Sequence, residues 1–220
     1  MKQLSARTAA VLKAVVFVAA LVPVTRLAVA VGIYPEWLGA NPAEYITRST
    51  GDWTLRFLLI TLAVTPLRRT LGWHWLAGFR RMLGLYAFFY CLVHVASFVS
   101  FDHVFELAEI LKDIVKRPFI TVGFLSLVLM LPLAISSTDK MVRRLGAKRW
   151  MALHRLVYVI APLGVLHFWW MVKADVTEPA IYAVIVACLL AYRVIAKIKE
   201  SRRRAGRSAR PPLPQPRPNA

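Results

Sequence analysis

The sequence predicts an all-α integral membrane protein, a bundle of six transmembrane helices with both termini in the cytoplasm. Three observations support this prediction. First, 58% of the residues are hydrophobic, whereas soluble domains are usually about 45–50% apolar. Second, the apolar residues gather in six runs, most of them close to the roughly 20 residues that cross a bilayer. Third, the 29 Lys and Arg residues, against 11 Asp and Glu, cluster at the ends of these runs.

The six apolar runs define the predicted helices. The second run is short and contains Arg56, so the pattern does not fix its ends. The first run resembles a cleavable signal peptide, because a basic start and an apolar centre precede Ala28-Val29-Ala30. Its apolar stretch continues on both sides of Arg26 and is long for a signal peptide, so we expect a retained helix. In chain order the runs are Ala10–Ile33, Trp53–Leu67, Leu83–Phe101, Phe119–Ser136, Met151–Val172 and Pro179–Ala196.

The segments between the runs alternate in charge and set the predicted orientation. The second loop carries four arginines and no acid, the fourth carries five basic residues against Asp139, and the tail is strongly basic. The first loop, by contrast, has three acids against Arg48. The positive-inside rule places the basic segments and both termini in the cytoplasm, which requires an even number of spans. We therefore expect a cytoplasmic N-terminus (1–9), a transmembrane domain (10–196) and a disordered cytoplasmic tail rich in Pro and Arg (197–220).

Composition excludes two other classes of protein. A net charge of +18 would suit nucleic-acid binding, but the basic residues lie at the ends of apolar runs, so no nucleic-acid partner is expected. The two cysteines, Cys91 and Cys188, both lie within apolar runs. A disulfide framework is therefore excluded, and there is no C-x-x-C-H motif for covalent heme attachment. The lipid bilayer is the partner that the composition predicts.

Two histidines inside the apolar runs form the strongest candidate site. His94 precedes Asp102 by eight residues and His167 precedes Asp175 by eight, so each lies roughly 12 Å from an acidic residue at the outer end of its helix. Ionisable side chains at such depth are costly and indicate function. Two imidazoles at equal depth on separate helices can supply both axial ligands of one heme iron, an arrangement that suits electron transfer. The alternative for each histidine is a hydrogen bond to a neighbouring helix.

A third histidine and three arginines are further candidates. His154 lies thirteen residues before His167, roughly 20 Å nearer the cytoplasm, and Arg80 and Arg81 occupy the matching depth on the other helix. These residues mark an inner region for a second heme, a flavin or a quinone; the alternative for His154 is a hydrogen-bonded interfacial histidine. Arg26 lies inside the first run and is a candidate partner for a heme propionate, the alternative being extension to the lipid headgroups.

Four motifs lie at these residues. In chain order they are R-R-M-L-G-L at Arg80–Leu85, L-V-H-V-A-S at His94, K-R-W-x-x-L-H-R-L-V-Y at His154 and L-H-F-W-W at His167. In this order they resemble the ferric-reductase-like transmembrane family over about residues 10–196, and most closely its heme-binding membrane subunits of periplasmic methionine sulfoxide reductase systems. In two-heme ferric reductases two helices carry two histidines each, whereas here an arginine takes the inner position on the first helix, so a complete second bis-His heme is not expected.

The resemblance implies a cytochrome b of the bacterial inner membrane. Such a subunit takes electrons from the quinone pool and passes them through heme b to a periplasmic molybdopterin catalytic subunit of the MsrP type. That partner reduces methionine sulfoxide in oxidised proteins, so this chain would transfer electrons and the partner would perform the sulfoxide chemistry. The resemblance also implies FMN, for which the sequence shows no motif. We expect the outer segment Asp102–Arg117 to contact the partner.

Two other functions are consistent with the sequence. The first is a ferric or other metal reductase that receives electrons from a separate cytoplasmic flavin reductase, because the segment after Ala196 is too short for a flavin domain. The second is a transporter or scaffold without a cofactor, although neither discontinuous helices nor repeated halves are visible. The absorbance of a b-type cytochrome in the purified protein would favour a redox function, and a colourless protein the transporter or scaffold.

Overall fold

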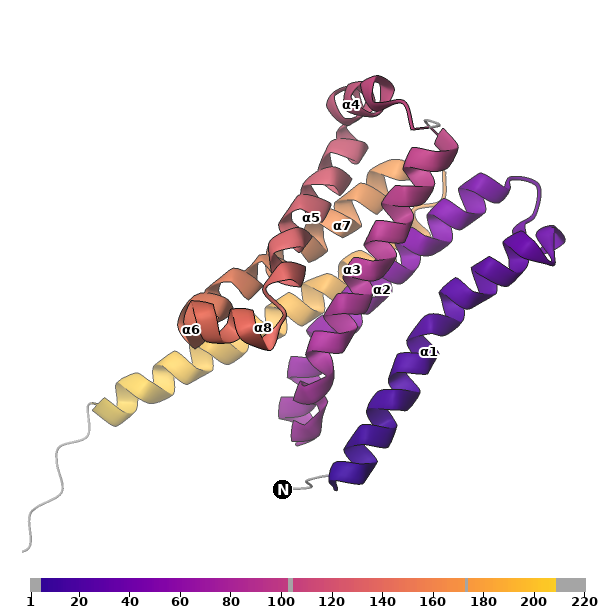
Figure 1. Ribbon diagram of the computed structural model, residues 1–220. Helices are drawn as coiled ribbons and strands as arrows, with labels where there is room; N and C mark the ends of the chain where they lie inside the picture. Colours follow the sequence, from indigo (N-terminus) through magenta and orange to yellow (C-terminus); the bar gives the residue numbers. More distant parts are fainter. Residues whose placement is uncertain (1–4, 103–104, 173, 209–220) are drawn as a thin grey trace, which may run out of the picture.

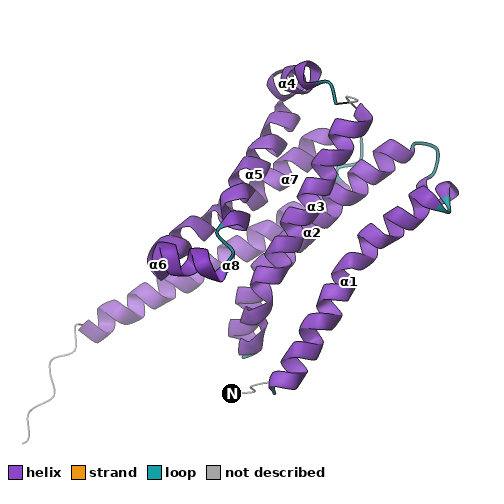
Figure 2. Cartoon of the chain, viewed as in Figure 1, coloured by secondary structure: helices purple, strands orange, loops and turns teal. Residues whose placement is uncertain are grey.

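The computed structural model describes residues 5–102, 105–172 and 174–208, and these are helical apart from short connections (Figure 1, Figure 2). Within these residues, three short 3-10 helices and one π-helical segment lie between or beside the α-helices. The 3-10 helices are η1 (Pro35–Leu38), η2 (His74–Phe79) and η4 (His154–Leu156), and the π-helical segment is η3 (Phe98–Asp102). The α-helices are α1 (Ala6–Gly32), α2 (Pro42–Thr70), α3 (Arg80–Ser97), α4 (Leu107–Lys116), α5 (Pro118–Ile135), α6 (Asp139–Leu153), α7 (Val157–Met171) and α8 (Thr177–Ser208).

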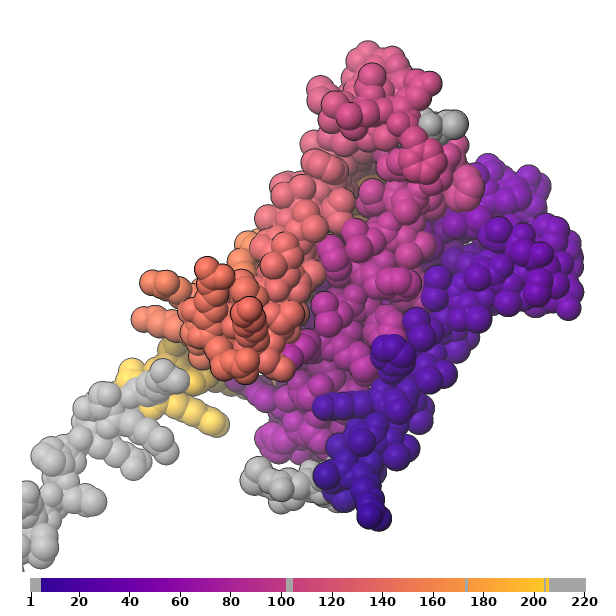
Figure 3. Space-filling view, in the orientation of Figure 1, coloured from indigo at the N-terminus to yellow at the C-terminus, as the bar shows by residue number. Residues whose placement is uncertain are grey.

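The long helices pack as two pairs with further helices against them. α2 packs against α3 and α5 against α7, while α3 contacts α5 and α2 contacts α7, which joins the pairs. α8 packs against both α7 and α2. α1 lies on the outside of this bundle, against side chains of α3 (Figure 3). The start of α1 and the end of α8 lie toward the end of the bundle that holds α6, and α4 covers the other end (Figure 1). We call these the α6 end and the α4 end.

Five helical segments within the described residues are long and apolar enough to cross a membrane. α2 is the remaining long helix. Its polar first half, which includes Asp52 and Arg56, keeps its mean hydropathy below that of the five segments. The all-helical fold and the apolar segments agree with the predicted multi-pass membrane protein. The five segments are Ala6–Gly32, His74–Phe101, Pro118–Ile135, Asp139–Met171 and Thr177–Arg203.

Two connections that we predicted to be loops contain helices. The outer segment at residues 102–117 includes α4, because its apolar residues recur at the spacing of one helical face despite its mixed charges. They are Leu107, Ile110, Leu111, Ile114 and Val115. The basic segment before Met151 forms α6, which is broken at Gly146, where a φ of 74° suits glycine.

Two predicted helix boundaries also need correction. The run Met151–Val172 was predicted as one helix, but η4 separates α6 from α7 at His154, so His154 and His167 do not share a continuous α-helix. The last helix, predicted to end at Ala196, continues as α8 through Ser208. Residues 209–220 of the predicted tail lie outside the described residues.

At the start of α8, hydrogen bonds from the side chain and backbone of Thr177 lower the pKa of Asp175.

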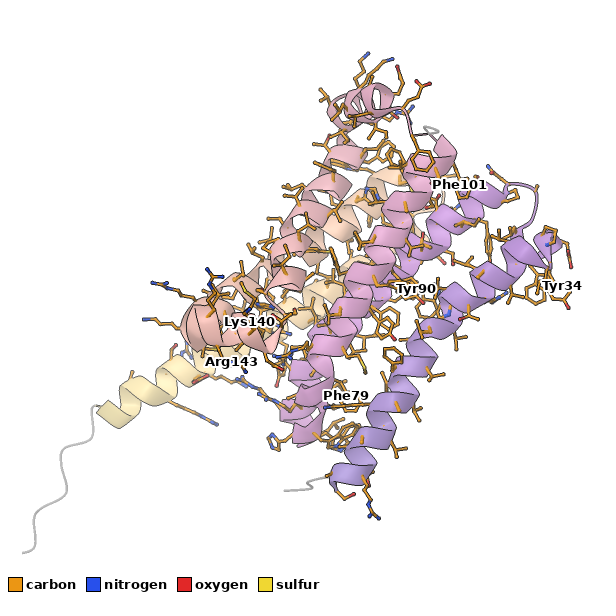
Figure 4. The ribbon with its side chains drawn as sticks, in the orientation of Figure 1. Tyr34, Phe79, Tyr90, Phe101, Lys140 and Arg143 are labelled. Carbon is orange, nitrogen blue, oxygen red and sulfur yellow. The ribbon has the colours of Figure 1, made fainter. Side chains whose placement is uncertain are left out.

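Tyr90 joins α1 to the bundle at a proline. Pro23 lies inside α1, and the Tyr90 side chain, which is fully buried, extends from α3 toward this helix (Figure 4). The Tyr90 hydroxyl donates a hydrogen bond to the Ala20 carbonyl at 2.7 Å and accepts one from the Val24 N–H at 3.2 Å. Residues 20 and 24 are the i and i+4 partners of a regular helix, so the hydroxyl satisfies backbone groups at the point where proline disturbs the helix.

Replacing Tyr90 by Phe is expected to lower the free energy of unfolding by about 1–3 kcal/mol, because two buried backbone groups lose their partner. The measurement is the midpoint of thermal unfolding of the full-length protein in detergent. Tyr45→Phe is the control, since the Tyr45 side chain is 38% exposed. Equal midpoints for the two variants would contradict a role for Tyr90 in attaching α1.

Candidate functional site

The structure brings His94 and His167 together at the α4 end of the bundle. His94 lies near the end of α3 and His167 near the end of α7. Their ring centroids are 6.0 Å apart, and the ring planes are nearly perpendicular, at 81°. The two residues that the sequence predicts at equal depth therefore lie side by side, although 72 residues of chain separate them.

His94 is positioned by the first part of α2. Its Nδ1 lies 2.8 Å from the carbonyl oxygen of Thr47. One turn further along α2, Gly51 leaves room for the imidazole, since a Cβ at this position would be 3.2 Å from both Cε1 and Nδ1 of His94. Ser97 reinforces the contact between the helices, because its hydroxyl accepts a hydrogen bond from the Thr47 hydroxyl at 3.1 Å and donates to the His94 carbonyl at 2.8 Å.

His167 is positioned in the same way by the first part of α5. Its Nδ1 lies 2.7 Å from the carbonyl oxygen of Phe119. Gly123 follows Phe119 by four residues, as Gly51 follows Thr47. A Cβ on Gly123 would lie only 2.8 Å from Nδ1 and 2.9 Å from Cε1 of His167. Each histidine therefore has a carbonyl and, one helical turn later, a glycine on a neighbouring helix.

These contacts define the protonation of both rings. A carbonyl oxygen can only accept a hydrogen bond, so Nδ1 carries the proton in His94 and in His167. In a neutral imidazole the other nitrogen, Nε2, then has a free lone pair. Two adjacent imidazoles with oriented Nδ1–H groups and free Nε2 lone pairs can serve as ligands to a metal.

The sequence did not reveal the carbonyl and glycine partners. Backbone carbonyls leave no trace in the residue types, and Gly51 stands in the polar part of α2 before the predicted second run. A signal was present, however, because α2 and α5 each contain a single glycine and it lies in the first part of the helix.

His154 lies at the other end of the bundle, in the turn η4. Its Nδ1 donates to the Trp150 carbonyl at 3.1 Å, and its ring stacks on the Trp150 indole with centroids 3.9 Å apart. The indole in turn donates from Nε1 to the Ser136 carbonyl at 2.9 Å, which ties this turn to the end of α5. These contacts favour the reading of His154 as a hydrogen-bonded interfacial residue.

The candidate arginines occupy different positions. Arg26 is exposed on α1, which favours extension to lipid headgroups over a contact with a propionate. Arg81 forms an ion pair with Asp139 of α6 at 2.7 Å. Arg80 donates to the Thr65 hydroxyl of α2 at 2.6 Å and belongs to a separate group of arginines described below. Among the described residues, neither Arg80 nor Arg81 is hydrogen-bonded to His154.

Comparison with known proteins gives consistent results. A model of the family described as "Ferric reductase like transmembrane component" matches residues 50–165. The chain is 60% identical over 185 residues to the "Protein-methionine-sulfoxide reductase heme-binding subunit MsrQ" of Herminiimonas arsenicoxydans, covering 83% of this chain and 84% of that protein. The protein of the same name from Ralstonia nicotianae is 55% identical, with coverages of 81% and 82%. That from Azospira oryzae is 47% identical, with coverages of 98% and 89%.

Proposed function

This chain belongs to the ferric-reductase-like transmembrane family and groups with its MsrQ proteins, and we propose that it is the heme-binding, electron-transferring membrane subunit of a protein-methionine-sulfoxide reductase system. The observation that carries the proposal is the pair of imidazoles of His94 and His167, each held through Nδ1 with Nε2 left free. The relatives at 47–60% identity are named as heme-binding subunits of such a reductase, which supports the same conclusion.

The residues at the α4 end fit a heme b. The rings of His94 and His167, with centroids 6.0 Å apart and Nδ1 donating to a carbonyl in each, would hold the heme through their Nε2 atoms. Within the described residues, no group of three or more His, Cys, Asp or Glu could hold a bare metal ion, so the pair suits a metal that brings its other ligands, as heme iron does. When bound, heme would supply one-electron redox chemistry.

The protein's own contribution is to hold and orient the two axial ligands. Donation from Nδ1–H to the Thr47 and Phe119 carbonyls fixes the tautomer and the ring direction, and increases the electron density at Nε2. The glycines allow α2 and α5 to approach the rings closely. Two histidines as ligands would suit a heme that transfers electrons and not one that binds oxygen.

We propose that α2 is the sixth membrane span. Its 29 residues extend about 43 Å, longer than the roughly 30 Å hydrocarbon core. Its charges have partners: Arg56 pairs with Asp52 at 3.8 Å and donates from Nε to the Tyr182 hydroxyl of α8 at 2.9 Å. Six spans place both termini on the α6 side, where Lys140 and Arg143 extend from α6 (Figure 4). By the positive-inside rule this side is the cytoplasm, and the membrane is the bacterial inner membrane.

Electrons would then leave the bundle at the periplasmic α4 end, beside the histidine pair. The proposed acceptor is a periplasmic molybdopterin subunit of the MsrP type, contacting the segment Asp102–Arg117 that contains α4. Reducing one sulfoxide to a thioether and water consumes two electrons and two protons, the number that one quinol releases on oxidation to a quinone. Quinol as the donor and FMN as a further cofactor are proposed from the family resemblance alone.

Reconstitution tests the whole proposal. The full-length chain in liposomes, given a quinol and the purified periplasmic partner, is expected to support reduction of methionine sulfoxide in an oxidised protein, measured by mass spectrometry. Liposomes that lack the chain should give no reduction. A colourless chain, or a chain whose heme accepts electrons from quinol without any sulfoxide being reduced, would refute the proposed role.

A further inference from the structure

Three arginines from three helices gather at the α6 end, far from the histidine pair. They are Arg68 near the end of α2, Arg80 at the start of α3 and Arg193 in α8. Arg80 lies within electrostatic range of both other guanidinium groups. It precedes His94 by fourteen residues, about 21 Å along α3. In the part of the chain that the structure describes, none of the three arginines forms an ion pair with a carboxylate.

Arg193 is held rigidly by its surroundings. Pro66 has no N–H, so the carbonyl of Leu62, four residues earlier in α2, has no partner within the helix. Arg193 donates from Nη2 to this carbonyl at 2.7 Å and from Nη1 to the Tyr158 hydroxyl of α7 at 2.7 Å. Its guanidinium also lies over the Tyr158 ring, 4.8 Å from the centroid. The position of this charge is therefore determined by α2 and α7 as well as by α8.

The group has donors that nothing in the described chain satisfies. The Nε atoms of Arg68 and Arg193 are both buried, and neither has a hydrogen-bond partner among the described residues. Arg80 donates from Nη2 to the Thr65 hydroxyl at 2.6 Å, which directs its guanidinium toward the end of α2. Buried donors without partners are rare and destabilising, and like charges that lie close together repel one another.

We propose that Arg68, Arg80 and Arg193 form a binding site for a phosphate group. A phosphate brings negative charge and several acceptor oxygens, which would satisfy the free Nε–H groups and offset the repulsion among the three cations. Arg193 lies sixteen residues after the start of α8, about 24 Å along the helix, which places the site near the inner headgroup level. The phosphate can belong to an anionic lipid headgroup or to a soluble phosphate ester.

The test uses the full-length protein with two kinds of probe. In nanodiscs, phosphatidylglycerol is compared with phosphatidylcholine, and lipid bound to the protein is counted by native mass spectrometry. In solution, FMN is compared with riboflavin, which lacks the phosphate, by fluorescence titration. Two variants, Arg68→Gln and Arg80→Gln, each remove one positive charge. The third, Arg193→Lys, keeps the charge, because the Arg193 side chain also joins α8 to α2 and α7. Arg144→Gln is the matched control, because Arg144 is exposed on α6 and its replacement removes the same charge.

We expect saturable binding of at least one phosphate-bearing probe, weakened about tenfold by Arg68→Gln and by Arg80→Gln and unchanged by Arg144→Gln. Saturation by phosphatidylglycerol identifies a lipid site, and saturation by FMN a site for a soluble ligand. Binding that is equal in the wild type and the Arg68 variant overturns the proposal. So does binding that distinguishes neither FMN from riboflavin nor the anionic phosphatidylglycerol from the zwitterionic phosphatidylcholine. Heme absorbance is recorded in parallel; it reports the proposed function independently, since the arginines are remote from His94 and His167.

Discussion

Replacing either His94 or His167 by Ala is expected to abolish the reduced-minus-oxidised absorbance of a low-spin b cytochrome. Each substitution removes one of the two proposed heme ligands. Changes in the groups around a metal ligand alone typically cost about 10–100-fold in affinity, so the loss of a ligand should lower heme content at least tenfold. The measurement is heme per protein, by pyridine hemochrome, in the full-length chain purified in detergent. Electron transfer to the periplasmic partner should be lost together with the heme.

His154→Ala provides the comparison for this experiment. His154 is hydrogen-bonded and stacked on Trp150 at the other end of the bundle, so its removal should leave the heme of the histidine pair in place. A chain that keeps its heme after loss of His94 or of His167 would exclude the bis-His assignment. Loss of about half of the heme in His154→Ala, with the remainder still low-spin, would instead indicate a second heme at the α6 end.

The sequence predicted the histidine pair because membrane helices have a simple geometry. Rise per residue is constant, and acidic residues mark the outer ends of two helices, so equal residue counts give equal depth. Depth alone does not determine which helices are neighbours, and the placement of His94 beside His167 depends on how α3, α5 and α7 pack. The carbonyls of Thr47 and Phe119 are invisible for the same reason, because they act through the backbone.

The errors in the sequence prediction have different physical causes. Hydropathy detects segments that face lipid, so it missed the polar first half of α2, which packs against other helices. It also does not distinguish a loop from a short helix between two apolar runs, as in α4 and α6. The arginine group at the α6 end was divided between the predicted second loop, with Arg68 and Arg80, and the last predicted helix, with Arg193. Only the packing of α2, α3 and α8 brings its members together.

The second large effect is expected at the two glycines beside the histidines. A Cβ on Gly123 would lie 2.8 Å from Nδ1 of His167, well inside the roughly 3.5 Å of an ordinary contact, and one on Gly51 would lie 3.2 Å from His94. Either the ring or the helix must then move, and the Nδ1–H···O=C bond weakens. We expect Gly123→Ala to lower heme affinity about 10–100-fold and Gly51→Ala to have a smaller effect in the same direction.

Gly84→Ala is the matched control, because it lies on α3 itself and a Cβ there would meet only Thr61, at 3.8 Å. Alanine is the better helix former by about 1 kcal/mol, so this variant should be at least as stable as the wild type and keep its heme. A general loss of folding would lower the unfolding midpoint of all three variants without changing the spectrum of the heme that remains. A specific effect on ligand orientation predicts a graded order, Gly123 then Gly51 then Gly84, in heme content and in the midpoint potential of the retained heme. Because that order follows the Cβ distances and not helix propensity, the same spectrum in all three variants would show that the close approach of α2 and α5 does not orient the ligands.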